Sequence, residues 1–183
     1  MSRLKNTPLV SVIMPVFNGE KYIAQAIDSI LQQTYKKLEL IIIDDASTDN
    51  TNDIINTIKD KRIKYIKNNK NSKEWYSRNV GLAKAKGDYI AWQDADDMAD
   101  KKRIDKQLLW LKQHKHHQMV GSDMAIINQY GKWLKTIPAT AMNMAWHRQR
   151  IFCPTTMFDK KILSAIPQPF FRPGVIGEDI DFL

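Results

Sequence analysis

The chain has 183 residues, 43% of them hydrophobic, which favours one domain with a packed core and excludes a disordered tail. Its 28 Lys and Arg residues against 20 Asp and Glu residues give a net charge of +8, so it should attract nucleic acid, anionic lipid headgroups or phosphorylated small molecules. A single cysteine, Cys153, excludes an internal disulfide framework, and no apolar run is long enough for a membrane span or a signal peptide. We therefore expect a cytoplasmic protein.

Apolar runs and amphipathic stretches alternate along the first 114 residues. Four short apolar runs predict buried strands, at residues 9–14, 38–43, 63–66 and 88–92. Helical spacing predicts four helices, over residues 20–32, around Ile54–Ile58, over 74–86 and over 101–114. Ser47, Thr48 and Asp49 are expected to cap the second helix and Gly87 to stop the third. Leu109 is expected to point inward with its apolar neighbours in the fourth helix.

The pattern loosens after Met119. Residues 119–137 fit a hairpin or a strand and its return, residues 141–151 a helix, and residues 155–158 a short strand. The alternation of strands and helices predicts an α/β sandwich with a mostly parallel sheet. Because the chain stops at Phe182-Leu183, where we expect a helix to begin, we expect it to be truncated.

Basic residues are concentrated between Lys59 and Lys73, where seven Lys and Arg side chains accompany one acidic residue, Asp60. A solvated loop and helix end is the simpler interpretation of this run. The alternative is a surface that meets a membrane or a polyanion.

Acidic residues gather after two predicted strands. Asp44–Asp49 follows the second strand and Asp94–Asp97 follows the fourth, so both should lie at the carboxyl edge of the sheet, where α/β proteins bind ligands. Singly, each aspartate is better explained by a turn or a helix cap. Together they favour a site for Mg²⁺ or Mn²⁺. The chain has neither a Gly-x-Gly-x-x-Gly motif nor a P-loop, so a nucleotide diphosphate would need a metal and basic side chains, such as Arg78.

Several ordered motifs match a known family. They are found at residues 10–18 (VSVIMPVFN), 31–35 (LQQTY), 40–49 (LIIIDDASTD), 77–79 with 85–91, 94–97 (DADD), 154–158 (PTTMF) and 177–182 (GEDIDF). On these motifs the chain resembles the family 2 inverting glycosyltransferases, from about Val10 to its last residue. Gln93 departs from the family pattern, in which a leucine is usual at that position.

The resemblance implies a GT-A fold, a three-layer α/β/α sandwich with a mostly parallel central sheet. It implies one catalytic domain over residues 1–183, with a nucleotide-binding half over 1–97 and an acceptor-side half over 98–183. The helices that normally follow the last motif are missing, so we expect the acceptor half to be incomplete.

The resemblance also implies the donor site. Pro15, Phe17 and Asp45 would line the nucleobase and ribose pocket, Arg78 would contact the nucleotide, and Asp94 would lie at the ribose. The donor would be a nucleotide-diphosphate sugar, with a UDP-linked sugar expected.

The metal and the base follow from the same motifs. Asp96 would coordinate Mn²⁺ or Mg²⁺ bridging the diphosphate, and Asp179, with Glu178 beside it, would take the proton from the acceptor hydroxyl. The acceptor would be a saccharide or a lipid-linked sugar in surface polysaccharide synthesis. Peripheral contact with an anionic membrane is expected, and nucleic acid is not an expected partner.

Two other functions fit parts of the sequence. A sugar-phosphate nucleotidyltransferase has a related fold, but that family needs a Gly-rich, Arg-containing loop where this chain has Pro15–Asn18. A catalytically silent module that binds nucleotides or anionic surfaces would keep the fold and the basic charge without needing a metal.

Overall fold

The computed structural model describes residues 7–128, 130–139, 153–166 and 168–171. The strands are β1 (Val10–Val16), β2 (Leu38–Asp44), β3 (Ile63–Lys67), β4 (Tyr89–Trp92), β5 (Met119–Val120), β6 (Met124–Ile127), β7 (Trp133–Ile137) and β8 (Met157–Asp159). The helices are α1 (Ile23–Leu31), α2 (Thr51–Thr57), α3 (Glu74–Lys84) and α4 (Arg103–Gln113), with 3-10 turns η1 (Cys153–Thr155) and η2 (Lys160–Ala165).

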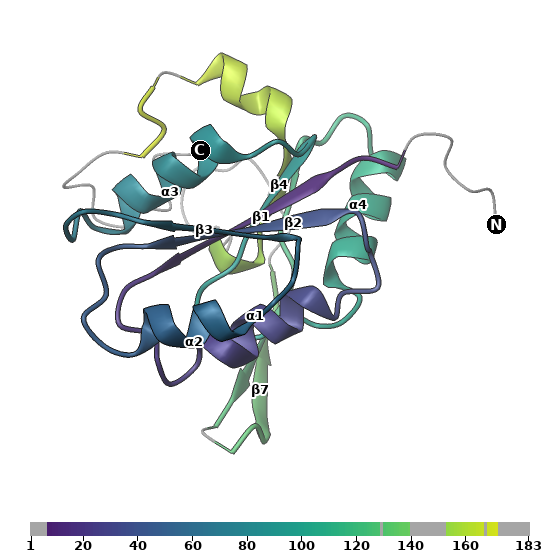
Figure 1. Ribbon diagram of the computed structural model, residues 1–183. Helices are drawn as coiled ribbons and strands as arrows, with labels where there is room; N and C mark the ends of the chain where they lie inside the picture. The colour runs from purple at the N-terminus through teal and green to yellow at the C-terminus, as the bar shows by residue number, and fades with distance from the viewer. Residues whose placement is uncertain (1–6, 129, 140–152, 167, 172–183) are drawn as a thin grey trace.

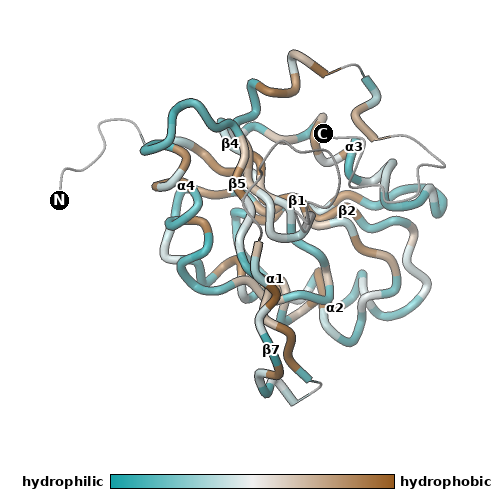
Figure 2. The backbone as a smooth tube through the Cα atoms, turned by 180° about the vertical axis from the view of Figure 1, so that it is seen from behind, coloured by the Kyte–Doolittle hydropathy of each residue, from teal (hydrophilic) through white to brown (hydrophobic). Residues whose placement is uncertain are grey.

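Six strands form one sheet in the order β3-β2-β1-β4-β8-β5. The first four are parallel, and β8 runs antiparallel to both β4 and β5. Strands β6 and β7 pair only with each other and project from the body as a separate hairpin (Figures 1 and 2).

The central strands are covered on both faces, because alternate residues of each strand enter two different clusters. In β1, Val12 and Met14 pack with α1, α2 and α4, whereas Ile13 packs on the other face with α3. Figure 1 shows α1 and α2 on one side of the sheet and α3 on the other. Gly81 lets α3 approach closely, since a Cβ there would lie 2.4 Å from Cγ2 of Ile13.

A buried carboxylate joins the middle of the sheet to the turn before β4. Glu39 accepts hydrogen bonds from Ser11 Oγ at 2.6 Å and from the Lys86 N–H at 2.7 Å, and it forms an ion pair with Lys64 of β3. Gly87 donates its N–H to Ser11 Oγ, and a Cβ at Gly87 would lie 2.6 Å from the Ser11 backbone nitrogen. A glycine is therefore required where this turn crosses β1.

The predicted order of elements up to α4 is confirmed, with four corrections of detail. Strand β1 continues through Pro15, which pairs with Ile43, instead of ending before it. Helix α2 begins at Thr51. Of the three residues expected to cap it, Ser47, Thr48 and Asp49, it is Asp49 that accepts the Thr51 N–H, at 3.0 Å.

Helix α3 ends at Lys84 because Ala85 is already extended, so Gly87 does not stop it. Leu109 is 58% exposed, since it lies about 100° around α4 from the buried Leu108.

The later predictions are partly confirmed. Residues 119–137 contain the short β5 and the β6–β7 hairpin, and the strand expected at 155–158 is β8, which begins only at Met157 after η1. The helix predicted over 141–151 and the expected helix at the chain end fall outside the described residues. Within the described residues, no helix has the length and apolarity needed to cross a membrane.

Candidate functional site

The direction of the chain changes between β1 and β4. From β1 the chain adds β2 and then β3 on one side, and it returns through α3 to place β4 on the other side of β1. Ligands of open α/β sheets bind at such a switch point, beyond the carboxyl ends of the strands. The loops after β1, β2 and β4 meet there and carry the candidate residues.

The loops after β1 and β2 are joined by hydrogen bonds. Asn18 Oδ1 accepts from the Thr48 N–H at 2.9 Å, and the Asn18 N–H donates to Ser47 Oγ at 3.0 Å. The Gly19 N–H donates to Thr51 Oγ1 at 2.8 Å. These contacts fix the two loops relative to each other.

Backbone strain is concentrated in the same loops. In the described part of the chain, the non-glycine residues with positive φ are Asn18 (52°), Ala46 (62°) and Lys73 (72°), which follow β1, β2 and β3 respectively. This conformation is costly for residues with a side chain, and it persists where surrounding contacts hold it. Its occurrence in three loops on one rim is consistent with a functional site there.

Asp45 holds the loop that leads from β3 to α3. Its buried carboxylate accepts hydrogen bonds from Asn68 Nδ2 at 2.7 Å, from the Ser72 N–H at 3.0 Å and from the Lys73 N–H at 2.8 Å. The last of these contacts stabilises the strained Lys73 at the start of α3. This role in positioning the loop was not apparent from the sequence.

The turn after β4 is rich in negative charge. Burial, helped by the nearby carboxylates of Glu74, Asp97 and Asp96 and opposed by Arg78, raises the pKa of Asp94 to about 7. Burial, and then the charge of Asp96, also raises the pKa of Asp97. Two carboxyl groups are therefore disfavoured as anions in this turn, and a bound cation would offset that cost.

Arg78 lies beside this turn on α3. Its guanidinium is buried, pairs with Glu74 one helical turn earlier, and lies 5.6 Å from the ring centroid of Trp92 and 5.5 Å from that of Phe171. Packing between two aromatic rings restricts where the guanidinium can point.

Two buried residues that were not predicted as site residues help to position the acidic turn. Gln93 is 2% exposed and donates from Nε2 to the carbonyl oxygens of Asp94 (3.1 Å) and Asp97 (2.9 Å). Its Oε1 accepts from Arg103 Nη2 at 3.2 Å. The departure from the family pattern at Gln93 thus supplies hydrogen bonds that a leucine could not make.

Arg103 also links β4 to η1. Its Nη1 donates to the carbonyl oxygens of Trp92 at 3.0 Å and Pro154 at 2.8 Å. Burial lowers the pKa of Arg103 to about 10, so it remains charged at neutral pH. Arg103 lies on the inward face of α4, four residues before the buried Gln107, and its local sequence gave no signal of this burial.

The Leu31–Tyr35 motif positions the start of α4. Gln33 is fully buried; its Nε2 donates to the Asp100 carbonyl oxygen at 2.8 Å and its Oε1 accepts the Ile104 N–H at 3.1 Å. The segment between the acidic turn and α4 is therefore anchored to the end of α1.

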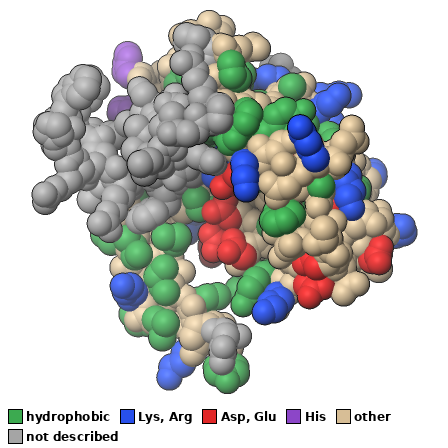
Figure 3. Space-filling model, turned by 90° about the vertical axis from the view of Figure 1, so that its left-hand side faces the viewer, with side chains coloured by type: hydrophobic (Ala, Val, Ile, Leu, Met, Phe, Trp, Pro, Cys, Tyr) green, Lys and Arg blue, Asp and Glu red, His purple; other side chains and the backbone are tan. Residues whose placement is uncertain are grey.

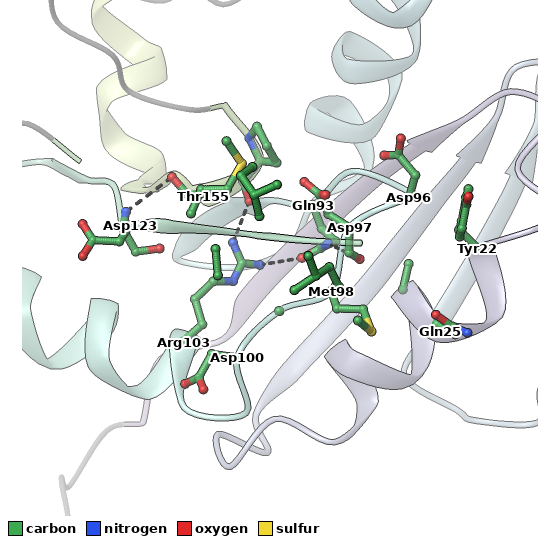
Figure 4. A pocket seen from close by; sticks show the side chains of 18 of the residues that line it. Tyr22, Gln25, Gln93, Asp96, Asp97, Met98, Asp100, Arg103, Asp123 and Thr155 are labelled. Carbon is green, nitrogen blue, oxygen red and sulfur yellow. Dashed lines mark hydrogen bonds between the residues drawn. The ribbon is translucent and has the colours of Figure 1, made fainter. Parts of the chain in front are cut away.

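A cavity of about 890 Å³ lies next to the acidic turn. Figure 4 shows Asp96 and Asp97 of the turn among its lining residues, together with Tyr22 just before α1, Gln25 of α1 and Arg103 of α4. The hairpin residues Met124–Asn128 close part of its rim. Acidic side chains gather beside a hollow on this face (Figure 3).

The structure brings together some of the predicted residues. Arg78 lowers the pKa of Asp94, and the charge of Asp96, which is exposed on the same turn, raises it. Asp45 lies one loop away and contacts the start of α3. Pro15 is partly buried in β1, and Phe17 is 49% exposed after it. Glu178 and Asp179 fall outside the described residues.

The acidic turn fits a metal only with help from a ligand. Within the described residues, no three Asp, Glu, His or Cys side chains are close enough to hold a metal ion. Mg²⁺ and similar ions are often held by one or two carboxylates together with substrate phosphates. Asp94 and Asp96 supply the right oxygen chemistry for that arrangement, with a diphosphate completing the coordination.

Comparisons with known proteins agree on one family. The profile described as "Glycosyl transferase family 2" matches residues 11–174. The putative glycosyltransferase EpsE of Bacillus subtilis is 44% identical over 70% of this chain and 47% of its own length. The Escherichia coli protein WfaP, named a UDP-Glc:alpha-D-GlcNAc-diphosphoundecaprenol beta-1,3-glucosyltransferase, is 46% identical over 58% of this chain and 43% of its own length.

A third relative, the putative teichuronic acid biosynthesis glycosyltransferase TuaG of B. subtilis, is 31% identical over 90% of this chain and 68% of its own length. Against EpsE and WfaP, the chain spans about half the length of the relative.

Solved structures show the same fold. S. aureus TarS in complex with UDP-GlcNAc has a TM-score of 0.69 at 25% identity, over 85% of this chain and 46% of that one. The mannosyltransferase PcManGT of Pyrobaculum calidifontis, in complex with GDP-Man and Mn²⁺, has a TM-score of 0.65 at 20% identity, over 96% and 50%. The predicted GT-A fold, with its mostly parallel central sheet, is confirmed.

Proposed function

Because the chain belongs to glycosyl transferase family 2, we propose that it is a metal-dependent inverting hexosyltransferase that moves a sugar from a UDP-linked donor to an acceptor hydroxyl. The names of WfaP and TarS support a UDP-sugar donor. The names of WfaP and TuaG support a saccharide or lipid-linked acceptor in surface polysaccharide synthesis. A lipid-linked acceptor would bring the protein to the inner face of the membrane.

The observation that carries this proposal is the acidic turn at the switch point of the sheet. Carboxyl groups with raised pKa values lie there beside a buried guanidinium. Such a turn is unfavourable by itself and becomes favourable when a divalent cation and a diphosphate bind together. PcManGT, which has the same fold, is described with Mn²⁺ and a nucleotide sugar.

On the donor side we assign five residues. Pro15, Phe17 and Asp45 line the nucleobase and ribose pocket, Arg78 contacts the nucleotide, and Asp94 lies at the ribose. Asp45 can do so while it holds the loop before α3, because that loop would then close beside the base. Residues 1–97 form the donor half in this scheme and residues 98–183 the acceptor half.

Asp96 is assigned as the metal ligand. A bound Mn²⁺ or Mg²⁺ would offset the charge that develops on the leaving nucleoside diphosphate. Asp96 is the exposed carboxylate of the turn, so it is free to reach a ligand, whereas Asp94 and Asp97 are partly buried.

For catalysis we assign Asp179 as the base that takes the proton from the acceptor hydroxyl, with Glu178 beside it on the acceptor side. A carboxylate across the sugar from the leaving group suits a single displacement with inversion, in which no covalent sugar–enzyme intermediate forms.

Calorimetry with UDP, with and without Mn²⁺, tests the donor and metal assignments. We expect UDP and Mn²⁺ to strengthen each other's binding, and Asp96→Ala to abolish that enhancement. Asp123→Ala is the matched control, because it removes the same charge from the rim of the same cavity away from the turn. Tight binding of UDP that needs no metal and survives Asp96→Ala would rule the assignment out.

The same calorimetry tests one of the two alternatives, and an assay for released pyrophosphate tests the other. A silent module on anionic surfaces would show no enhancement of UDP binding by Mn²⁺. A sugar-phosphate nucleotidyltransferase would release pyrophosphate from UTP and a sugar phosphate, which the proposed transferase would not do.

A further inference from the structure

The β6–β7 hairpin is a separate two-stranded sheet. Its strands pair with each other from Met124 opposite Ile137 to Ile127 opposite Trp133, and with no other strand of the described structure. An isolated two-stranded hairpin is marginally stable in water unless something covers one of its faces. We therefore expect a partner to cover the outer surface of this hairpin.

The outer part of the hairpin is apolar and exposed. Among the described residues nine large hydrophobic side chains are exposed, and four of them belong to this hairpin: Ile127 (40%), Tyr130 (84%), Trp133 (60%) and Leu134 (53%). The others are scattered over different elements, from Phe17 to Leu109. Exposed apolar side chains concentrated on one projecting element mark an interaction surface.

The hairpin is also purely basic. Lys132 and Lys135 are exposed, and neither side chain has a carboxylate partner among the described residues. The sequence has no Asp or Glu between Asp123 and Asp159. Figure 3 shows hydrophobic and Lys or Arg side chains together on the projecting part of the molecule.

The basic run between Lys59 and Lys73 is less available. Arg62, Lys64 and Lys67 of that run lie within ion-pair distance of Asp60, Glu39 and Asp44. Three of its seven basic side chains are thus already compensated within the fold. On the hairpin, exposed aromatic side chains occur together with positive charge that has no ion-pair partner among the described residues.

We propose that the tip of the β6–β7 hairpin docks on an anionic membrane surface. Tyr130, Trp133 and Leu134 enter the interfacial region, where Trp and Tyr are favoured, and Lys132 and Lys135 lie against the headgroups. A second copy of the chain fits this surface less well. A two-fold interface would bring the same patch of both copies together, so that their lysines would repel each other.

Docking there would place the candidate site close to the membrane. The inner part of the hairpin, residues 124–128, lines the same cavity as Asp96. The docking proposal does not depend on the proposed sugar transfer, since none of the residues assigned to the donor site lies in the hairpin.

Sedimentation with vesicles of phosphatidylcholine, with and without phosphatidylglycerol, tests the proposal at low and at physiological salt. We expect the protein to bind only the anionic vesicles, and more weakly as salt rises. Each basic residue near such a surface contributes about 1 kcal/mol, so Lys132→Glu/Lys135→Glu should weaken binding by roughly 25-fold or more. Lys61→Glu/Lys70→Glu is the charge-matched control in the other basic run, and it should have the smaller effect.

A second pair of variants tests the apolar contact. Leu134→Ser should weaken vesicle binding several-fold, whereas Leu109→Ser, at an equally exposed leucine on α4, should not. Circular dichroism of each variant verifies that the fold is kept. Sedimentation velocity without vesicles measures self-association.

The outcomes are distinct. Loss of binding in both hairpin variants, with both controls intact, supports the proposal. The proposal is overturned if the unaltered chain does not bind anionic vesicles at low salt. It is also overturned if the Lys61/Lys70 variant loses vesicle binding while the hairpin variants keep it. Self-association that Leu134→Ser abolishes, without any change in vesicle binding, would assign the hairpin to a second copy instead. None of these results bears on UDP binding, which tests the proposed function separately.

Discussion

At the scale of single residues, Asp45 shows how one carboxylate can serve the fold and a ligand site together. It closes β2 at the rim of the sheet, and its oxygens are occupied by donors from residues 68–73. The loop that they hold carries the strained Lys73 into α3, the helix that presents Arg78. A substitution of Asp45 should therefore alter the stability of this loop even when no ligand is bound.

We expect Asp45→Ala to loosen the loop locally. Two backbone N–H groups, of Ser72 and Lys73, would lose their acceptor, which should lower the free energy of unfolding by about 1 to 3 kcal/mol. Hydrogen exchange of these two amides should become faster in the absence of ligand. Lys70→Ala, in the same loop, is the control and should leave both amides protected. Unchanged exchange at Ser72 and Lys73 would contradict a role in holding the loop.

Sequence reasoning found the residues that carry a recognisable motif and missed those that support them. Asp94 and Asp96 follow a strand end in a cluster, which is a signal that the sequence shows directly. Gln93 and Arg103 are polar, and nothing in their local pattern marks them as buried. Their partners, the Asp97 carbonyl oxygen and the Pro154 carbonyl oxygen, become visible only when β4, α4 and η1 are assembled.

At the scale of elements, the period of the apolar residues was the reliable signal. Nearly continuous apolar runs, interrupted by Ser11 in β1 and by Glu39 in β2, correctly predicted both strands, because both of their faces are covered. The ends of elements were less predictable. A proline pairs within β1, and α3 ends before its glycine, because tertiary contacts at those points outweigh local propensity.

Glu39 makes the contacts between elements that can be tested most directly. This carboxylate of β2 receives hydrogen bonds from Ser11 of β1 and from the turn before β4, and it pairs with Lys64 of β3. Burial by itself would raise the pKa of Glu39, but the hydrogen bonds from Lys64, Ser11 and the Lys86 N–H outweigh it and lower the pKa below the usual 4.5.

We expect the cost of Glu39→Gln to depend on pH. A carboxyl group with a lowered pKa in the folded state stabilises the fold above its unfolded pKa, and this contribution is lost as pH falls through the folded pKa. At pH 7 the variant should lose about 1 to 3 kcal/mol, because the Lys64 ammonium would face an amide. Urea unfolding should show this difference shrinking below about pH 4.

Asp53→Asn on the exposed face of α2 makes the same chemical change away from the network, and it should cost less than about 0.5 kcal/mol at pH 7. A Glu39→Gln difference that stays constant from pH 7 to acid would show that shape, rather than charge, sets the cost.

At the scale of the whole molecule, α4 joins the parallel part of the sheet to the segment that follows it. Arg103 connects the end of β4 with Pro154, 51 residues along the chain, and does so through a guanidinium with no direct carboxylate partner among the described residues. Its charge is compensated at longer range by Asp97 and Asp94 of the acidic turn. The turn and the packing of η1 therefore depend on the same side chain.

We expect Arg103→Lys to affect both stability and the site. An ammonium group cannot span the acceptors that the planar guanidinium reaches, so at least one of the Trp92, Gln93 and Pro154 oxygens would lose its donor. The free energy of unfolding should fall by about 2 to 4 kcal/mol, measured by urea unfolding. Calorimetry should show weaker joint binding of UDP and Mn²⁺, because Gln93 would no longer be held beneath the acidic turn.

The control for this exchange is Lys101→Arg, the reverse substitution at an exposed position just before α4. It should change stability by less than about 0.5 kcal/mol and leave ligand binding as it was. Both measurements are needed, since a loss of stability with normal UDP and Mn²⁺ binding would limit Arg103 to packing. If instead Arg103→Lys were as stable as the parent chain, the bridge between β4 and η1 would not contribute to the fold, and another contact would have to position η1.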